Sequence, residues 1–409
     1  MNEAVNVGLR QEDGFVVVTL EGDPYQIGLQ HGRLLADRIQ LMRRTLYDDL
    51  IFRQGRLFGL GFVALARSIT AILERHIPEP LKLEIRGVAD GSGIGYRDVL
   101  FFNCFDDLLH ALIRLVLTLP PQARARVGLA CSALVSLPSP GGDEPMLLGR
   151  NLDYYVSGGV LGADGIVTRT MKEQLVCFAV RPDRGARFFS IGWPGFVGTV
   201  TGVNQHGVAI ACLTSALPGQ TPNGTPLPLL YRSILQWSGE LDQVERIVRR
   251  ARRTVGNNLV AVSARERNAA LFEFTPREVR RRDPIDGRLA TTNHFQDAQL
   301  AARQAQWLLP NSTHRYRRLE TLCATPEVTV SDGQRFLLDT CPSSDAEAEE
   351  FSCLYNPGTV YSTVIAPRER RLWLRATDRV DRPFVSLDLA AELGLESALK
   401  PRVLTATSG

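Results

Sequence analysis

The spacing of hydrophobic and polar residues divides the chain into two parts near residue 130. In the first part, apolar residues recur with helical spacing after the start signal Asp23-Pro24 and continue to about Ile51. The same spacing predicts helices over 62–76, 78–90 and 98–117, and one strand-like run precedes them at 15–20. We therefore expect the first third of the chain to be mostly helical.

From residue 131 the pattern changes to short β-rich runs separated by glycine and proline, as in antiparallel sheets. Strands are predicted at 131–136, 146–152, 174–180, 187–191, 198–203, 207–213, 258–264, 269–274, 288–293, 359–366 and 371–376. Helices are predicted at 227–238, 241–252 and 312–325. Helices thus flank strands on both sides in the sequence. The stretch 119–128 is the clearest candidate for an exposed loop, directly before Cys131.

The composition is that of a globular protein without a marked charge preference. With 409 residues, 44% of them hydrophobic, the chain can bury a large core in one or two domains. Lys and Arg outnumber Asp and Glu by only 47 to 44, so no nucleic-acid partner is expected. The start of the chain lacks a signal-peptide pattern, and no run of eighteen uninterrupted apolar residues occurs. We expect no membrane partner and a cytoplasmic location.

The seven cysteines carry no metal or disulfide signature. They are scattered, without a Cys-x-x-Cys pair or clustered histidines, which argues against a zinc site and against a disulfide framework. We expect most of them to be reduced thiols and expect no metal.

One segment can bring chemically complementary groups together. Cys131 opens a predicted strand, and a second strand carrying Arg150 and Asp153 follows, so a hairpin could place a thiol, a guanidinium and a carboxylate near one another. A fixed cation stabilises the thiolate, which is the nucleophilic form of cysteine. The plainer alternative is that Cys131 is a small buried residue at the start of a strand.

The loop before Cys131 suggests how this thiol could be activated. If the chain is cut after Ala130, Cys131 becomes an N-terminal residue with a free α-amine. Such an amine has a pKa of about 7.7–8.0 and can take the proton of the thiol in its own residue. The alternatives are ordinary nicking of an exposed loop, or no cleavage.

Several short motifs resemble those of a known family across nearly the whole chain. They are Gly28-Leu-Gln-His31-Gly32, Arg86-Gly87-Val-Ala-Asp-Gly91, Cys131-Ser132, Gly149-Arg150-Asn151-Leu152-Asp153, Gly202-Val-Asn204-Gln-His-Gly207, Thr292-Asn293-His294-Phe295 and Ser312-Thr-His-Arg315-Tyr316-Arg-Arg318-Leu319. In their order and spacing they resemble the autoproteolytic N-terminal-nucleophile (Ntn) hydrolases of the acyl-CoA:6-aminopenicillanate (isopenicillin N) acyltransferase type.

The resemblance implies an α+β fold, a four-layer αββα sandwich of mainly antiparallel sheets, as a single domain over 1–409. It also implies that the precursor is cut between Ala130 and Cys131, giving a small chain 1–130 and a catalytic large chain 131–409 that stay associated. Ala130 stands where many relatives carry glycine.

The resemblance also implies roles for individual residues. Cys131 would be the nucleophile and its own base, and Asp153 would bind the freed α-amine. Arg150 would steady the thiolate or a substrate carboxylate, and Arg315 matches a late arginine of the family. Asn258, with its neighbour Asn257 as the second choice, would help bind the oxyanion of the tetrahedral intermediate.

Four further residues are candidates for substrate binding or packing. The aromatic loop containing Trp193 and Phe196 is typical of an apolar wall for an acyl chain. His294 could line the substrate pocket or end a strand. His31, between two glycines in a helix, is interpreted as structural, with its ring bonded to a backbone carbonyl.

The function expected from this sequence is acyl transfer or amide hydrolysis through an acyl-enzyme on Cys131. The partners would be a small-molecule acyl donor, for which acyl-CoA is a candidate, and an amine or water as acceptor, without a cofactor. The alternatives are a pure amide hydrolase of the penicillin V acylase or bile-salt hydrolase kind, and a catalytically silent αββα binding protein.

Overall fold

The computed structural model describes residues 7–117, 126–139, 141–157, 166–215, 219–304, 309–341, 352–376 and 382–395. Within these ranges the strands form two large sheets, one of nine strands and one of six. All strand pairs are antiparallel except β2 with β5. The mainly antiparallel character predicted from the sequence is therefore confirmed.

The nine-stranded sheet runs in the order β1-β2-β5-β6-β7-β8-β9-β10-β11. Its strands are β1 (Gly8–Glu12), β2 (Phe15–Gly22), β5 (Val176–Pro182), β6 (Phe188–Gly192), β7 (Thr201–Asn204), β8 (Val208–Thr214), β9 (Asn257–Ser263), β10 (Asn268–Phe274) and β11 (Val279–Arg282). Most of these strands are buried on both faces, which explains their near-continuous apolar runs.

The six-stranded sheet runs in the order β12-β3-β4-β13-β14-β15. Its strands are β3 (Arg126–Ser136), β4 (Leu147–Ser157), β12 (Arg288–Thr291), β13 (Thr359–Ala366), β14 (Arg371–Arg375) and β15 (Val385–Asp388). β3 and β4 are the two longest strands, and they form the hairpin that carries Cys131, Arg150 and Asp153.

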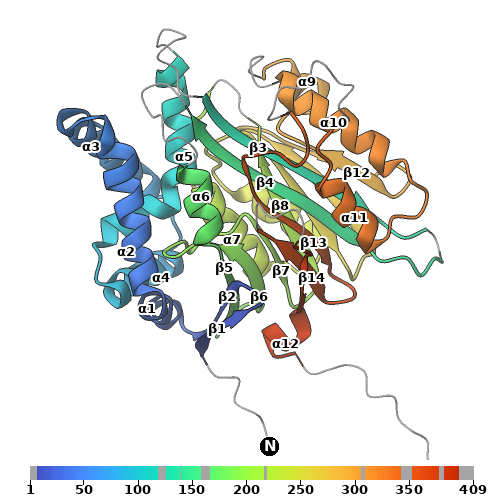
Figure 1. The fold of residues 1–409 in the computed structure, drawn as a ribbon, viewed down its shortest axis with the longest axis horizontal. Helices are drawn as coiled ribbons and strands as arrows, with labels where there is room; N and C mark the ends of the chain where they lie inside the picture. The colour runs from blue at the N-terminus through green and yellow to red at the C-terminus, as the bar shows by residue number, and fades with distance from the viewer. Residues whose placement is uncertain are drawn as a thin grey trace, which may run out of the picture.

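Three hydrophobic cores separate four layers, with helices on the outer face of each sheet (Figure 1). The first core joins the nine-stranded sheet to helices that include α1 (Pro24–Leu34), α4 (Glu79–Ser92), α5 (Tyr96–Leu117), α7 (Leu227–Trp237) and α8 (Leu241–Arg250). The second lies between the two sheets, and the third joins the six-stranded sheet to α10 (Leu309–Cys323) and α11 (Val330–Leu337). The expected αββα sandwich is confirmed.

Close packing of α1 against α4 explains the glycines of both helices. A Cβ atom added at Gly28 would lie 2.0 Å from the carbonyl oxygen of Glu84, and one at Gly32 would lie 2.4 Å from that of Val88. Gly87 approaches the carbonyl oxygen of Tyr25 equally closely, at 2.3 Å from the position of an added Cβ. These helices touch backbone to backbone, a distance that only glycine permits.

The helix predicted from Asp23 to Ile51 is interrupted. Helix α1 ends at its C-cap residue Leu35, and the chain continues as α2 (Ala36–Arg44). A π-helical stretch, η1 (Thr45–Ile51), and a short 3-10 turn, η2 (Phe52–Gln54), then follow. The prediction of one continuous helix is therefore wrong. The structure also adds elements that the sequence pattern did not predict, namely β1, β11, β15, α6 (Ile166–Glu173), α9 (Ala298–Ala301), α11 and α12 (Leu389–Leu393).

Helix α3 (Arg56–Glu74) is unusually apolar for its exposure. By length and composition it could cross a bilayer, with a mean hydropathy of 1.6 and only 22% of that window buried. A core helix of a soluble protein can pass the same test, so the expectation of no membrane partner stays a prediction.

The cysteine expectations need one correction. Cys341 and Cys353 form a disulfide, although the spacing of the cysteines argued against such bridges. The signal was absent because the twelve-residue separation matches no recognised motif. The other five, Cys104, Cys131, Cys177, Cys212 and Cys323, are free and buried, so most cysteines are reduced thiols as expected.

Candidate active site

Cys131 lies inside strand β3, and strand alternation decides what its side chain faces. Cys131 and Ala133 point into the core between the sheets, whereas Ser132 points toward α10, where its hydroxyl accepts a hydrogen bond from Arg315 at 2.9 Å. Cys131 is 7% exposed and borders a pocket in that inter-sheet core. The thiol is thus buried but reaches a cavity.

Arg150 is the cation next to this thiol. Its Nη2 atom donates to Cys131 Sγ at 3.3 Å. Its Nη1 atom donates to the carbonyl oxygen of Val200 at 2.5 Å and to the Thr201 hydroxyl, and the guanidinium lies 5.8 Å from the ring centroid of Tyr361. Val200 and Thr201 belong to the nine-stranded side and Tyr361 to β13, beside β4, and together they fix the guanidinium, which is 1% exposed, against the sulfur.

The backbone of Cys131 is held at both its nitrogen and its oxygen. The N–H donates to Asn293 Oδ1 at 2.6 Å, and the carbonyl oxygen accepts from Arg315 Nη1 at 2.5 Å. Arg315 Nη2 also donates to Asn293 Oδ1, at 3.0 Å. Arg315 therefore reaches the Cys131 backbone through a buried network that α10 positions, and it is not exposed on a helix face.

Asn293 is the site residue that sequence reasoning did not assign. It follows β12, its Nδ2 donates to the carbonyl oxygen of Thr214 at 2.8 Å, and it is 3% exposed. The signal was present, because Thr292-Asn293-His294-Phe295 is one of the motifs that carry the family resemblance.

Burial raises the pKa of the Cys131 thiol, and the positive charge of Arg150 offsets part of that shift. The negative charge of Asp153 adds to the rise. In the uncleaved chain the surroundings of Cys131 therefore favour the neutral thiol, and a thiolate in the cleaved chain stays a prediction. The expected α-amine is missing from this balance, since the nitrogen of Cys131 is still an amide.

Asp153 lies on β4 directly opposite Ala130, the residue before Cys131. Its carboxylate accepts from the Thr359 hydroxyl at 2.7 Å and from Asn356 Nδ2 at 3.1 Å. Burial raises the pKa of Asp153 to about 6, although the charge of Arg315 and these hydrogen bonds lower it.

Arg150 and Asp153 do not share one face of β4. They are three residues apart, so they point to opposite sides of the strand. Asp153 still borders the same pocket as Cys131. Its proposed partner, the nitrogen of Cys131, is bonded to Asn293 in this uncleaved state.

Asn258 lies at the start of β9 but its amide group is already engaged. Its Nδ2 atom donates to the carbonyl oxygens of Thr292 and His294, at 3.0 and 2.8 Å, so it fixes the segment that carries Asn293. Asn257 instead accepts from the Tyr231 hydroxyl at 2.7 Å. The oxyanion role of Asn258 stays a prediction.

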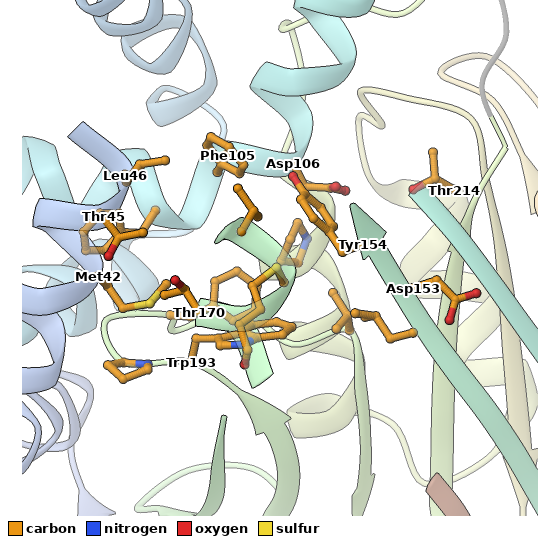
Figure 2. A pocket seen from close by; sticks show the side chains of 18 of the residues that line it. Met42, Thr45, Leu46, Phe105, Asp106, Asp153, Tyr154, Thr170, Trp193 and Thr214 are labelled. Carbon is orange, nitrogen blue, oxygen red and sulfur yellow. The ribbon is translucent and has the colours of Figure 1, made fainter. Parts of the chain in front are cut away.

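A largely apolar cavity of about 170 Å³ lies in front of Cys131 (Figure 2). Its wall includes residues from α2, η1, α5, β4, α6, the 193–196 loop and β8. The apolar members are Met42, Leu46, Leu50, Phe102, Phe105, Leu152, Val167, Met171, Trp193, Pro194, Phe196, Val200 and Pro228. Such a cavity suits an aliphatic or aromatic acyl group.

Trp193 and Phe196 both line this cavity, with their rings in an edge contact at 5.8 Å. Two buried side chains fix their loop. His31 Nε2 accepts from the Gly195 N–H at 2.9 Å, and Asn103 Oδ1 accepts from the Val197 N–H at 2.7 Å. Burial lowers the pKa of His31 to about 3, so the ring is a neutral acceptor. His31 is structural, as expected, but its partner is an N–H group and not a carbonyl.

His294 is not among the residues that line this cavity, and its role in substrate binding stays a prediction. Its Nδ1 atom hydrogen-bonds with the Ser312 hydroxyl at 2.8 Å, and its ring packs edge-on against Tyr316 at 5.2 Å. Burial and the charge of Arg315 lower the pKa of His294 to about 4. Its contacts are with α10, on the outer side of the six-stranded sheet.

The expected cleavage site lies within a strand. Residues 119–125 of the predicted loop 119–128 fall outside the described residues. Residues 126–128 are not loop, because Arg126–Ser136 forms one continuous strand in which Ala130 and Cys131 are paired with β4. Ala130 is 6% exposed. Within the described ranges, no group of three or more His, Cys, Asp or Glu side chains is arranged to hold a metal ion.

Comparison with known proteins adds independent information. A family model described as acyl-coenzyme A:6-aminopenicillanic acid acyl-transferase matches residues 141–380, a range that begins after Cys131 and includes Arg150, Asp153 and Arg315. An uncharacterized protein of Archaeoglobus fulgidus is 26% identical over 252 residues, 59% of this chain and 40% of that protein. The 40 kDa form of acyl-coenzyme A:6-aminopenicillanic-acid-acyltransferase from Emericella nidulans is 24% identical over 306 residues, 75% of this chain and 76% of that protein.

Several relatives are longer than the part that matches. The matched part of the chain spans 40% of the archaeal protein and 53% and 51% of the Dictyostelium discoideum proteins dcd1A and dcd1B. Among solved structures, penicillin V acylase from Agrobacterium tumefaciens has 15% identity and a TM-score of 0.42, covering 64% of this chain and 86% of its own. Because the family model covers more than half of the sequence, the chain belongs to the acyl-coenzyme A:6-aminopenicillanic acid acyl-transferase family.

Proposed function

We propose that this protein is a cysteine acyltransferase or amide hydrolase that is activated by its own cleavage between Ala130 and Cys131. One observation carries the proposal: the Cys131 thiol borders an apolar cavity with the Arg150 guanidinium 3.3 Å from its sulfur. Membership in the acyltransferase family supports the same chemistry. The other free cysteines, apart from Cys212, do not border this cavity.

Cleavage begins with attack of the Cys131 sulfur on the carbonyl carbon of Ala130. The bond between that carbon and the nitrogen of Cys131 breaks, the nitrogen gains a proton, and a thioester remains. Water then hydrolyses the thioester, which releases residues 1–130 with a terminal carboxylate and restores the thiol. Arg315, bonded to the carbonyl oxygen of Cys131, and Asn293, bonded to its nitrogen, support this step by fixing the backbone beside the scissile bond.

Turnover then uses the new α-amine as a base. It takes the thiol proton, and the thiolate attacks the carbonyl carbon of a thioester or amide to form a tetrahedral intermediate. The α-ammonium returns the proton to the leaving group, and an acyl-enzyme remains on Cys131. Water or an amine attacks the acyl-enzyme and restores the thiol. Asp153, freed from its strand partner Ala130 by cleavage, would hold the α-ammonium.

The intact mass of the purified protein tests the processing step. Cleavage gives chains of 130 and 279 residues that separate under denaturing conditions, with Cys131 at the new N-terminus. Cys131→Ala should remain one chain. Cys177→Ala is the matched control, because Cys177 is buried in the same inter-sheet core without bordering the cavity, and it should still be cut. An uncut wild-type chain after prolonged incubation, or a cut elsewhere, contradicts the proposal.

Transferase and hydrolase activities are separated by adding hydroxylamine to a thioester or amide assay. A transferase diverts the acyl group to the hydroxamate, whereas a pure hydrolase keeps forming the free acid. Release of the acyl group by neither route, together with an uncut chain, would favour the binding-protein alternative. A cytoplasmic location and the absence of a cofactor, with acyl-CoA as a candidate donor, are part of this proposal.

A further inference from the structure

One charged side chain stands out in the apolar cavity. Asp106, on α5, lines the wall beside Phe105 and Tyr154, and its side chain is 29% exposed (Figure 2). His110 Nδ1 lies 3.9 Å from this carboxylate and hydrogen-bonds instead to the backbone oxygen of Asp106 at 2.6 Å. Within the described residues, the Asp106 carboxylate has no Lys or Arg partner within 4.0 Å.

Tyr154 provides a second, independent polar group in the same wall. It lies on β4, its side chain is 8% exposed, and its hydroxyl has no hydrogen-bond partner in the described part of the chain. Burying a hydroxyl without a hydrogen-bond partner costs free energy. A ligand that hydrogen-bonds to the Tyr154 hydroxyl would recover that free energy. Figure 2 shows the ring of Tyr154 next to Asp106.

The two groups are near each other without being bonded. Burial raises the pKa of Tyr154, and the negative charge of Asp106 raises it further, yet the hydroxyl makes no hydrogen bond to the carboxylate. The charge of Asp106 also reaches Cys212, which borders the cavity beside Cys131. Asp106 and Cys131 line the same cavity, so a ligand held by Asp106 occupies the same cavity as the nucleophile.

We propose that Asp106 and Tyr154 form a subsite that binds a protonated amine of the substrate. The preferred substrate is then an amide or thioester with an apolar body that carries an ammonium group on its acyl side or on its leaving-group side. An unpaired carboxylate among aromatic walls selects a cation, because a neutral or anionic group would leave it without a partner or repel it. This inference rests on the proposed function, since it assigns specificity to the same cavity.

The bound ammonium is a spectator and not the attacking acceptor. A protonated nitrogen has no lone pair, so it cannot attack an acyl-enzyme. The cation therefore belongs either to the acyl group or to the leaving group. These two sources share one chemistry, and substrates that carry the ammonium on one side or the other distinguish them.

The experiment compares ammonium substrates with neutral isosteres at pH 7. One pair places the charge on the acyl group, 6-aminohexanoyl against heptanoyl 4-nitroanilide. The other places it on the leaving group, N-(6-aminohexyl)hexanamide against N-heptylhexanamide. Wild-type protein should prefer the ammonium member of one pair about 10- to 100-fold in kcat/KM, the range of a charge-assisted hydrogen bond.

The variants test the two polar groups separately. Asp106→Asn should abolish the preference by lowering kcat/KM for the ammonium member far more than kcat/KM for its neutral isostere. Tyr154→Phe should reduce the preference in part. Asp183→Asn, an exposed carboxylate outside the cavity wall, is the matched control and should keep it. No preference in either pair, or an equal loss for both members in Asp106→Asn, overturns the subsite.

A binding measurement keeps the inference independent of catalysis. Hexylammonium and 1-hexanol are titrated calorimetrically into wild-type and Asp106→Asn protein. Tighter binding of hexylammonium that Asp106→Asn abolishes supports the subsite even if no amide is turned over, a result that would count only against the proposed function. Equal binding of the two probes to wild-type protein overturns the subsite.

Discussion

Asn293 Oδ1 lies 2.6 Å from the backbone nitrogen of Cys131, the atom that cleavage would convert into an α-amine. The same oxygen accepts from Arg315 Nη2 at 3.0 Å, so one carbonyl group connects the proposed terminus to a buried arginine. An amide oxygen can accept from the peptide N–H before cleavage and from an ammonium after it. Asn293 is therefore placed to act in both states.

Removing this acceptor should slow processing. Asn293→Ala leaves the Cys131 N–H and Arg315 Nη2 without their common partner, and we expect cleavage to slow by about 10- to 100-fold. Asn293→Asp retains an oxygen acceptor and should be cut faster than Asn293→Ala. The fraction of cut chain is measured by denaturing mass spectrometry over time. Asn268→Ala, a half-buried asparagine of β10, serves as control, and equal rates in all three variants would remove Asn293 from the site.

Two thiols border the cavity, and we expect only Cys131 to act as the nucleophile. Cys131 and Cys212 are each 7% exposed, and burial raises the pKa of both, with Arg150 lowering both in part. Cleavage gives Cys131 alone an α-amine as a base. Brief alkylation near neutral pH followed by peptide mapping should therefore label Cys131 in cut protein and abolish acyl transfer. Cys212→Ala should still be cut and labelled, and preferential labelling of Cys212 with activity retained would refute the nucleophile assignment.

Asp153 should make the stability of the uncut chain depend on pH. Burial raises its pKa to about 6 from an ordinary value of about 3.9, so its contribution is fully present below about pH 4 and is lost as pH rises through 6. We expect the free energy of unfolding to fall by up to about 3 kcal/mol between pH 4 and 7, relative to Asp153→Asn. Urea denaturation of both proteins in a Cys131→Ala background measures this difference. Parallel pH profiles would contradict the shift.

Asp153→Asn should also impair cleavage or turnover much more than substitution of a surface carboxylate, because it removes the charge that would hold the α-ammonium. The extent of cleavage and the rate of substrate hydrolysis are measured in the variant, with Asp183→Asn as the surface control. Wild-type behaviour in both assays would remove Asp153 from the mechanism.

Helix packing provides a test of the fold itself. A Cβ at Gly28 would lie 2.0 Å from the Glu84 carbonyl oxygen, so Gly28→Ala should destabilise the protein by about 3 kcal/mol or more. Gly61, in α3, has nothing within 4 Å of an added Cβ, so Gly61→Ala should be neutral or stabilising by up to about 1 kcal/mol. Chemical denaturation compares the two. Similar effects of both substitutions would contradict the close contact of α1 and α4.

Hydrophobic periodicity correctly predicted the helices and strands whose own sequences carry a clear helical or strand spacing. The change from helical to strand spacing near Cys131 matches the change from α5 to β3, and most strands of both sheets begin within three residues of their predicted positions. The π-helical stretch Thr45–Ile51 was not predictable, because its residues keep an apolar spacing that also suits a regular helix. The short strands β11 and β15 are formed by pairing with neighbours and carry little pattern of their own.

The sequence predicted several residues of the site, but few of the contacts between them. Cys131 and Arg150 meet, because the β3–β4 hairpin places them on one face. Asn293 and Cys131 are 162 positions apart in the sequence, so no local sequence pattern could predict their contact. The position of the Asp106 carboxylate in the cavity wall was likewise not predictable, because in the sequence Asp106 is one polar residue of an otherwise ordinary helix.

The cavity wall is divided between the two sides of the Ala130–Cys131 bond. Met42, Leu46, Phe105 and Asp106 come from the segment before it, whereas Cys131 and Arg150 come from the segment after it. Substitutions that remodel ligand preference can therefore accumulate in the first segment while the reacting groups stay untouched. A family built this way can acquire new substrates by exchanging only the part of its sequence that precedes the Ala130–Cys131 bond.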